Sequence, residues 1–190
     1  MAALVAVALA GAPAHAQASD SHKLIKAVRD GDAEQVQSLL SLPTPGLLAA
    51  KDRDTGETAL HIVVAQRNLT WLRFLLSKQA RLDLQDKDGN TPLATAARLG
   101  WTEGAAQMLA DKANVDAANR RGETPLILAV QKRDLPMVRL LMKHGANPKR
   151  TDSAAGLSAI DYAKRDARAT QILKALEAPV PTSAVLVPGR

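Results

Sequence analysis

The chain has 190 residues, of which 46% are hydrophobic, enough for one domain with a continuous core. Aromatic residues make up only 2%, so Leu, Ala, Val and Ile must build that core, which favours close helix packing over a β-sandwich. The absence of cysteine excludes disulfides and thiolate chemistry, and the net charge of +6 weakly favours acidic partners.

The first sixteen residues are typical of a secretory signal. Small apolar residues run from Ala2 to Ala10, and Ala14–Ala16 has the A-x-A form of a cleavage site. The pattern predicts a signal peptide at 1–16, cleaved after Ala16, and export to the periplasm or beyond the cell. The apolar run is far shorter than the roughly 20 residues of a membrane span. No Lys or Arg precedes it, so either the signal is atypical or the true start lies upstream of Met1. The alternative is a disordered, Ala-rich leader on a cytoplasmic protein.

Three later segments repeat one pattern every 33 residues. They read GETALHIVV from Gly56, GNTPLATAA from Gly89 and GETPLILAV from Gly122. After each of them, apolar residues recur at three- and four-residue steps, as in 69–76, which is the spacing of one buried helical face. Each unit is therefore predicted to form a short helix, a tight turn, a longer helix and a loop.

The recurring residues have structural roles in this interpretation. The glycines close loops in which a Cβ atom would clash. The Thr two positions after each glycine can cap the first helix, and Pro92 and Pro125 suit its first position, where no backbone N–H is needed. Asp134, followed by Leu135 and Pro136, repeats this device at the start of a second helix.

The G-x-T-P-L-H-x-A pattern at this period resembles the ankyrin repeat. The resemblance covers roughly 20–178 and implies an all-α solenoid of about five stacked helix–turn–helix units joined by β-hairpin-like loops. It also implies that His61, in the one copy that keeps the motif's His, is a hydrogen-bonding link to the next unit. The predicted domain is 17–178, followed by a Pro-rich, disordered tail at 179–190. The five predicted units of this domain are 20–52, 53–85, 86–118, 119–151 and 152–178.

No pattern in the sequence indicates catalysis. It contains no Ser/His/Asp arrangement and no G-x-x-x-x-G-K phosphate loop. The loops DRDTGE and DKDGN space their carboxylates like part of a calcium loop, but neither has the bidentate Glu at the twelfth position. His22 and His144 have no second ligand one helical turn away. We therefore predict no catalytic residue, no cofactor and no metal site.

The candidate site is the surface. By resemblance, the loop tips and the exposed side of each first helix would line a concave face, and its charge would change from acidic to basic along the stack. The alternative is that these are ordinary solvated loop charges. Trp101 stands where the family usually has a polar residue, so we predict a partly exposed anchor, whereas Trp71 and Phe74 are predicted to lie in the core. The other candidates are Asp54, Glu57, Gln66, Lys87, Asp88, Asn90, Arg98, Arg120, Arg121, Glu123 and Lys132.

These observations predict a non-catalytic scaffold, exported and monomeric, that binds a protein partner through its concave face. The alternative is a basic protein that binds nucleic acid or an anionic surface, suggested by a pI near 9.8 and by the pairs 120–121 and 132–133. Against it, the positive charges are interleaved with Asp and Glu, and the loops carry no aromatic residues on which bases could stack.

Overall fold

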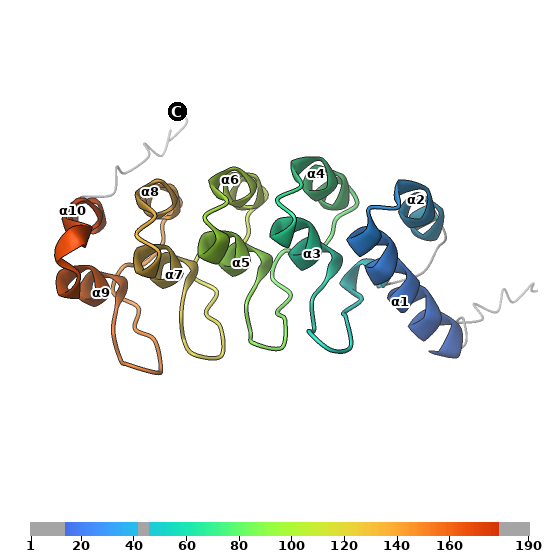
Figure 1. The fold of residues 1–190 in the computed structure, drawn as a ribbon, viewed down its shortest axis with the longest axis horizontal. Coiled ribbons are helices and arrows are strands. Elements are labelled where there is room, and N and C mark those ends of the chain that lie inside the picture. Colours follow the sequence, from blue (N-terminus) through green and yellow to red (C-terminus); the bar gives the residue numbers. More distant parts are fainter. Residues whose placement is uncertain (1–13, 42–45, 179–190) are drawn as a thin grey trace, which may run out of the picture.

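A computed structural model describes residues 14–41 and 46–178, and within them the chain forms helix pairs that stand side by side in a row (Figure 1). The predicted tail at 179–190 lies outside the described residues, as do the first thirteen residues of the predicted signal peptide. The α-helices are α1 (Ala14–Asp30), α2 (Ala33–Ser41), α3 (Ala59–Ala65), α4 (Leu69–Ser77), α5 (Pro92–Leu99), α6 (Thr102–Ala110), α7 (Pro125–Gln131), α8 (Leu135–Lys143), α9 (Ala159–Arg165) and α10 (Thr170–Glu177).

The helices form two layers, which confirms the predicted all-α solenoid. The odd-numbered helices α1 to α9 form one layer, called the inner layer, and the even-numbered helices form the outer layer; the loops project from the inner layer (Figure 1). Short 3₁₀ turns at Leu47–Ala49 and Ala167–Ala169 complete the first loop and the last unit. In the described ranges no helix is long and apolar enough to cross a bilayer.

The predicted caps begin helices of both layers. The Thr91 hydroxyl accepts a hydrogen bond from the Ala94 amide at 3.2 Å, and Thr124 does the same for Ile127 at 3.3 Å. The Asp134 carboxylate accepts from the Met137 amide at 2.9 Å at the start of α8. Each contact satisfies an amide that the helix leaves without a partner.

The loops between units are hairpin-like, as predicted, although no strand forms in the part of the chain that the structure describes. The Asp86 amide donates to the Asn90 carbonyl at 3.0 Å, and isolated bridges join Lys51 to Thr58 and Thr151 to Ser158. Gly89 has a φ of +82°, and a Cβ placed there would lie 2.6 Å from the Arg120 amide nitrogen of the next loop. The repeated glycine therefore permits close contact between adjacent loops.

The turn between the two helices of a unit also requires a positive φ. Gly100 supplies it in the third unit with a φ of 69°, whereas Arg67 and Arg133 adopt values of 53° and 55° in the neighbouring units. Such a conformation costs a residue with a Cβ about 1–2 kcal/mol. Both arginines contact the following unit, because Arg67 donates to the Leu99 carbonyl and Arg133 pairs with Asp166 at 2.6 Å. Both contacts favour this conformation, although an exposed ion pair contributes only about 0–1 kcal/mol.

The prediction that Trp101 is an exposed anchor is wrong. Its side chain is only 7% exposed and belongs to the core. The indole lies over Gly104 in the first turn of α6, where an added Cβ would come within 2.2 Å of the ring. The glycine three residues after Trp101 makes room for the ring, so the spacing W-x-x-G was the signal for burial.

Trp71 and Phe74 are only partly buried, so the prediction that they lie in the core is wrong in degree. Their rings pack edge to face, with centroids 5.8 Å apart and planes at 88°. They line an apolar hollow of about 290 Å³ on the outer layer, together with residues of α2 such as Ala33 and Gln37. The helix α2 contacts α4 little, which leaves this side of both aromatic rings open.

Candidate functional site

The loop tips are joined to one another along the stack. The Lys87 amide donates to the Thr55 carbonyl at 2.9 Å, and the Arg120 amide donates to the Asp88 carbonyl at 3.0 Å. The Ser153 amide donates in the same way to Arg121, at 2.7 Å. Because each loop is bonded to the one before it, the tips form one continuous edge along the stack.

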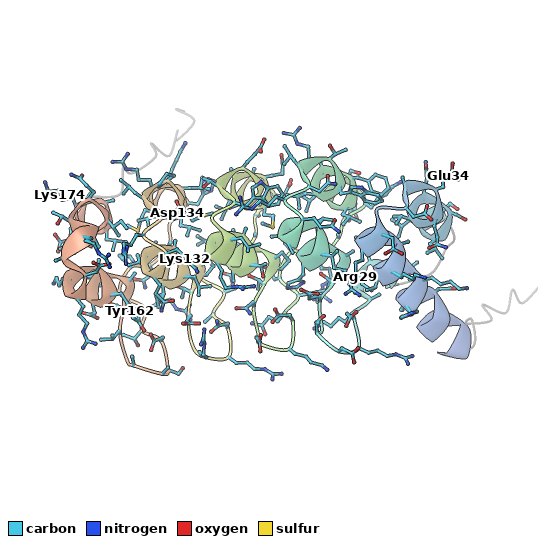
Figure 2. The ribbon with its side chains drawn as sticks, viewed as in Figure 1. Arg29, Glu34, Lys132, Asp134, Tyr162 and Lys174 are labelled. Carbon is cyan, nitrogen blue, oxygen red and sulfur yellow. The ribbon has the colours of Figure 1, made fainter. Side chains whose placement is uncertain are left out.

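The first of these loops is closed by Asp52. Its carboxylate accepts from the amides of Thr55 at 3.0 Å and Asp54 at 2.9 Å, and from the guanidinium of Arg29 at 3.0 Å. Hydrogen bonds from those two amides, with help from Arg29, lower the pKa of Asp52 to about 2. Figure 2 shows Arg29 on α1, where that helix faces the loop. Arg29 also lies 3.8 Å from Glu57, so it offsets the acidic charge predicted for this end of the face.

His61 links two units, as the resemblance implied. Its Nδ1 atom accepts from the Thr58 amide at 3.2 Å, which leaves the proton on Nε2, and Nε2 donates to the Asn90 carbonyl at 2.9 Å. The side chain is 1% exposed. Burial lowers the pKa of His61 below its ordinary value of 6.5, so the ring is neutral in the folded protein at pH 7.

The lowered pKa of the buried His61 ring predicts how the stability of the fold depends on pH. Below about pH 6.5 the unfolded chain takes up a proton on His61 that the folded chain does not. The free energy of unfolding should therefore fall as the pH is lowered below 6.5, and level off only below the folded-state pKa. Urea titrations between pH 7.5 and pH 5 measure this slope. The variant His61→Ala, which copies Ala94 of the next unit, should be less stable at pH 7 and should lose part of the slope; an unchanged slope would contradict the assignment.

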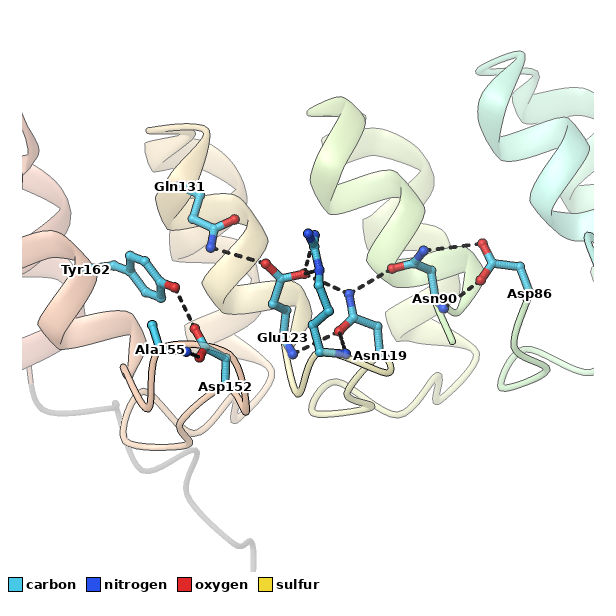
Figure 3. A network of polar contacts seen from close by, with 9 residues as sticks. Asp86, Asn90, Asn119, Glu123, Gln131, Asp152, Ala155 and Tyr162 are labelled. Atoms are coloured by element: carbon cyan, nitrogen blue, oxygen red, sulfur yellow. Dashed lines mark hydrogen bonds and ion pairs between the residues drawn. The ribbon is translucent and has the colours of Figure 1, made fainter. Parts of the chain in front are cut away.

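Behind the loop tips, polar side chains form a row across neighbouring units (Figure 3). Asn90 donates from its side chain to Asp86 at 3.3 Å and accepts from the Asn119 amide group at 3.1 Å. The same amide group donates to Glu123 at 2.9 Å, and the guanidinium of Arg121 donates to Glu123 at 2.7 and 3.0 Å. The row ties the third unit to the fourth.

The row corrects two of the predicted contact residues. Asn90 is 8% exposed and Glu123 is 6% exposed, and their polar atoms are occupied by the contacts just described. Gln66, although exposed, donates to the Arg29 carbonyl at 3.0 Å and so joins α3 to the first unit. These three side chains hold the stack together. Their positions in the repeat suggested surface residues. Their role in packing was not visible in the sequence, because only the three-dimensional structure shows which partners they contact.

Five of the predicted residues line one hollow of about 340 Å³ between the third and fourth units: Asp88, Asn90, Arg98, Arg120 and Arg121. Sequence reasoning missed two further lining residues, Asn119 and Leu128. Asn119 lies one repeat period of 33 residues after Asp86, and this was an available signal for Asn119. Nothing in the sequence singled out Leu128.

The remaining candidates do not meet in this hollow. Asp54 and Lys87 are exposed in the loops before α3 and α5, and Glu57 lies beside Arg29. Lys132 is exposed at the C-terminal end of α7 (Figure 2). Among the described residues, no group of three His, Asp or Glu side chains is placed to hold a metal ion. The arrangement offers hydrogen-bond donors and positive charge rather than a catalytic pair.

Comparison with known proteins agrees with this architecture. The family model described as ankyrin repeats (3 copies) matches residues 24–119 and 71–152. An ankyrin repeat-containing protein of Treponema pallidum (strain Nichols) is 34% identical over 141 residues, which are 74% of this chain and 46% of that protein.

Two further relatives are similar to part of this chain. Protein PhlB of Serratia liquefaciens is 31% identical over 140 residues, covering 73% of this chain and 60% of that protein. The B-cell lymphoma 3 protein homolog of Mus musculus is 36% identical over 97 residues, or 48% of this chain and 22% of that protein. The chain thus covers less than two thirds of each relative. Together with the stacked helix pairs, these matches show that it belongs to the ankyrin repeat family, whose repeats are protein–protein interaction modules.

Proposed function

We propose that this chain is a non-catalytic, monomeric scaffold that binds a protein partner through its concave face, centred on the hollow between the third and fourth units. The observation that carries the proposal is the set of exposed side chains gathered there. Asp88, Arg98 and Arg120 line the hollow, and none of their three side chains makes a hydrogen bond or ion pair with another described residue. Their backbones are nevertheless fixed by α5 and by the bonded loop tips.

A surface of this kind loses little conformational entropy when it binds. The loop that carries Arg120 is already bonded to the loop that carries Asp88, so docking does not have to order it. Charged groups held in fixed positions also orient an approaching partner and set its register. Both effects favour a folded protein surface or a segment of one as the partner.

Photo-cross-linking tests the proposal. With p-benzoylphenylalanine in place of Asp88, irradiation of cells should give a discrete cross-linked species, and Arg120→Glu should remove it. The matched control places the same amino acid at Arg139, an exposed position on α8 in the outer layer. Equal yields of the same species from positions 88 and 139, or a species only from position 139, would show that the concave face is not the binding face.

We further propose that the chain is exported and cleaved after Ala16. The apolar run and the A-x-A sequence support this, and cleavage would shorten α1 without removing its buried residues Leu24, Ile25, Ala27 and Val28. Mass spectrometry of the protein from the native host checks it. The expected N-terminus is Gln17 in the periplasmic or secreted fraction, and a cytoplasmic protein that retains 1–16 would contradict the proposal.

A further inference from the structure

We propose that the partner segment is acidic and extended, with two carboxylates three residues apart, one for each of two neighbouring hollows on the concave face. This inference rests on the proposed function and specifies the chemistry of its partner. The first hollow is the one lined by Arg98 and Arg120. The second, of about 280 Å³, lies between the fourth and fifth units and is lined by Val130, Gln131, Tyr162, Arg165 and Asp166.

The first hollow presents positive charge that the protein itself does not neutralise. Arg121 is committed to the buried carboxylate of Glu123, at 2.7 Å. Arg98, at the end of α5, and Arg120, at a loop tip, form no ion pair with another described residue. Asp88 is the one acidic residue of the lining. Two guanidinium groups beside the apolar side chain of Leu128 suit a carboxylate on a short aliphatic stem, because guanidinium matches the planar carboxylate group with paired hydrogen bonds.

The second hollow lies one unit further along, at the C-terminal ends of α7 and α9, and it has a different lining. Asp166 is occupied by Arg133, at 2.6 Å, and by Arg168, at 3.4 Å. Arg165 is exposed and makes no ion pair among the described residues. The Tyr162 hydroxyl donates to Asp152 at 2.5 Å, so this ring forms a fixed wall. Arg165 is thus the cation that remains for a ligand.

Helix α7 lies between the two hollows and contributes side chains to the lining of both. Gln131 lines the second hollow, and its side-chain amide donates to Glu123 at 3.4 Å, behind the first hollow (Figure 3). Helices packed side by side lie about 8–10 Å apart. An extended polyproline-type chain rises about 3.1 Å per residue with three residues per turn, so residues i and i+3 point to the same side about 9 Å apart. The first hollow lies between α5 and α7 and the second between α7 and α9, so two acidic side chains at that spacing would each face one hollow.

The test uses the full chain and three acetylated peptides of eight residues built from Ser and Pro. One has Glu at positions 3 and 6, one has adjacent Glu residues at 3 and 4, and one has Gln at both 3 and 6. Binding is followed by NMR through the Nε–H signals of the arginines. We expect the 3,6-peptide to bind at least tenfold more tightly than the Gln peptide and several-fold more tightly than the adjacent-Glu peptide. Equal affinities for the 3,6-peptide and the Gln peptide would overturn the inference.

Variants locate the binding. Arg98→Gln combined with Arg120→Gln should weaken binding of the 3,6-peptide at least tenfold. Arg165→Gln alone should weaken it by a smaller factor. The matched control, Arg139→Gln combined with Lys143→Gln on the exposed side of α8, should leave it unchanged. Loss of binding in both double variants would mean that net charge alone holds the peptide, and would contradict a site.

Two outcomes separate this inference from its alternatives. A single-stranded oligothymidylate of eight nucleotides that bound more tightly than the 3,6-peptide, through the same arginines, would replace the acidic segment with a phosphate backbone. If none of the peptides bound while the cross-link from position 88 persisted, the inference would fail and the proposed function would stand.

Discussion

Replacing Leu126 by alanine should lower the free energy of unfolding by about 2–5 kcal/mol, the range found for buried leucines. Leu126 lies in the first turn of α7 and is completely buried. The helix α7 packs against α5, α8 and α9, so one truncation removes contacts within its own unit and with both neighbours. Because each unit depends on its neighbours, the loss should reach beyond the fourth unit.

Urea unfolding followed by far-UV circular dichroism measures this effect. The control is Leu82→Ala, a truncation of the same chemistry at a half-buried position in the loop after α4, which should cost much less. A broadened or two-step transition for Leu126→Ala would show that the stack separates at the fourth unit. Equal costs for the two variants would contradict the assignment of Leu126 to the shared core.

Gly89→Ala should be nearly as damaging, for a different reason. A φ of +82° costs a residue with a Cβ about 1–2 kcal/mol. The added Cβ would also lie 2.6 Å from the backbone nitrogen of Arg120, and relieving such an overlap costs typically about 1–3 kcal/mol more. Backbone cannot rotate away as a side chain can, so the loops that carry Gly89 and Arg120 must separate.

Gly145→Ala is the matched control for this effect. Gly145 has a φ of +85°, but a Cβ at that position would meet no atom within 4 Å. Gly145→Ala should therefore lower the free energy of unfolding only by the cost of the positive φ. The difference in stability between the two variants then measures the contact between the loops. Equal stability losses for Gly89→Ala and Gly145→Ala, measured by the same urea titration, would mean that the loops are not held together as described.

The helical repeat units could be predicted because the residues that begin their helices act locally. The Thr caps, the prolines in the first turns and the capping Asp134 each act within four residues along the chain. His61 was also predictable, because the family motif places it. Arg98 and Arg120 were both predicted to lie on the candidate face, but they occupy different repeat positions, so the hollow that they share became visible only in the structure.

The burial of three candidate residues could not be predicted from the general repeat pattern. Asn90 and Glu123 occupy repeat positions that suggest a surface, yet they are buried because Asn119 and Arg121 supply their partners. Trp101 is buried because Gly104 leaves space for it. In each case burial was decided by a neighbouring residue whose size or charge the general repeat pattern does not specify.

Amide hydrogen exchange in the free protein tests most directly whether the concave face is organised before it binds a partner. The amides of Arg120 and Ser153 lie in loop tips but donate to the preceding loops, at 3.0 and 2.7 Å. Both should exchange much more slowly than the amide of the adjacent, exposed Ala154, for which the described residues provide no acceptor. Exchange of Arg120 and Ser153 as fast as that of Ala154 would show that the tips move independently, and would contradict a preformed binding face.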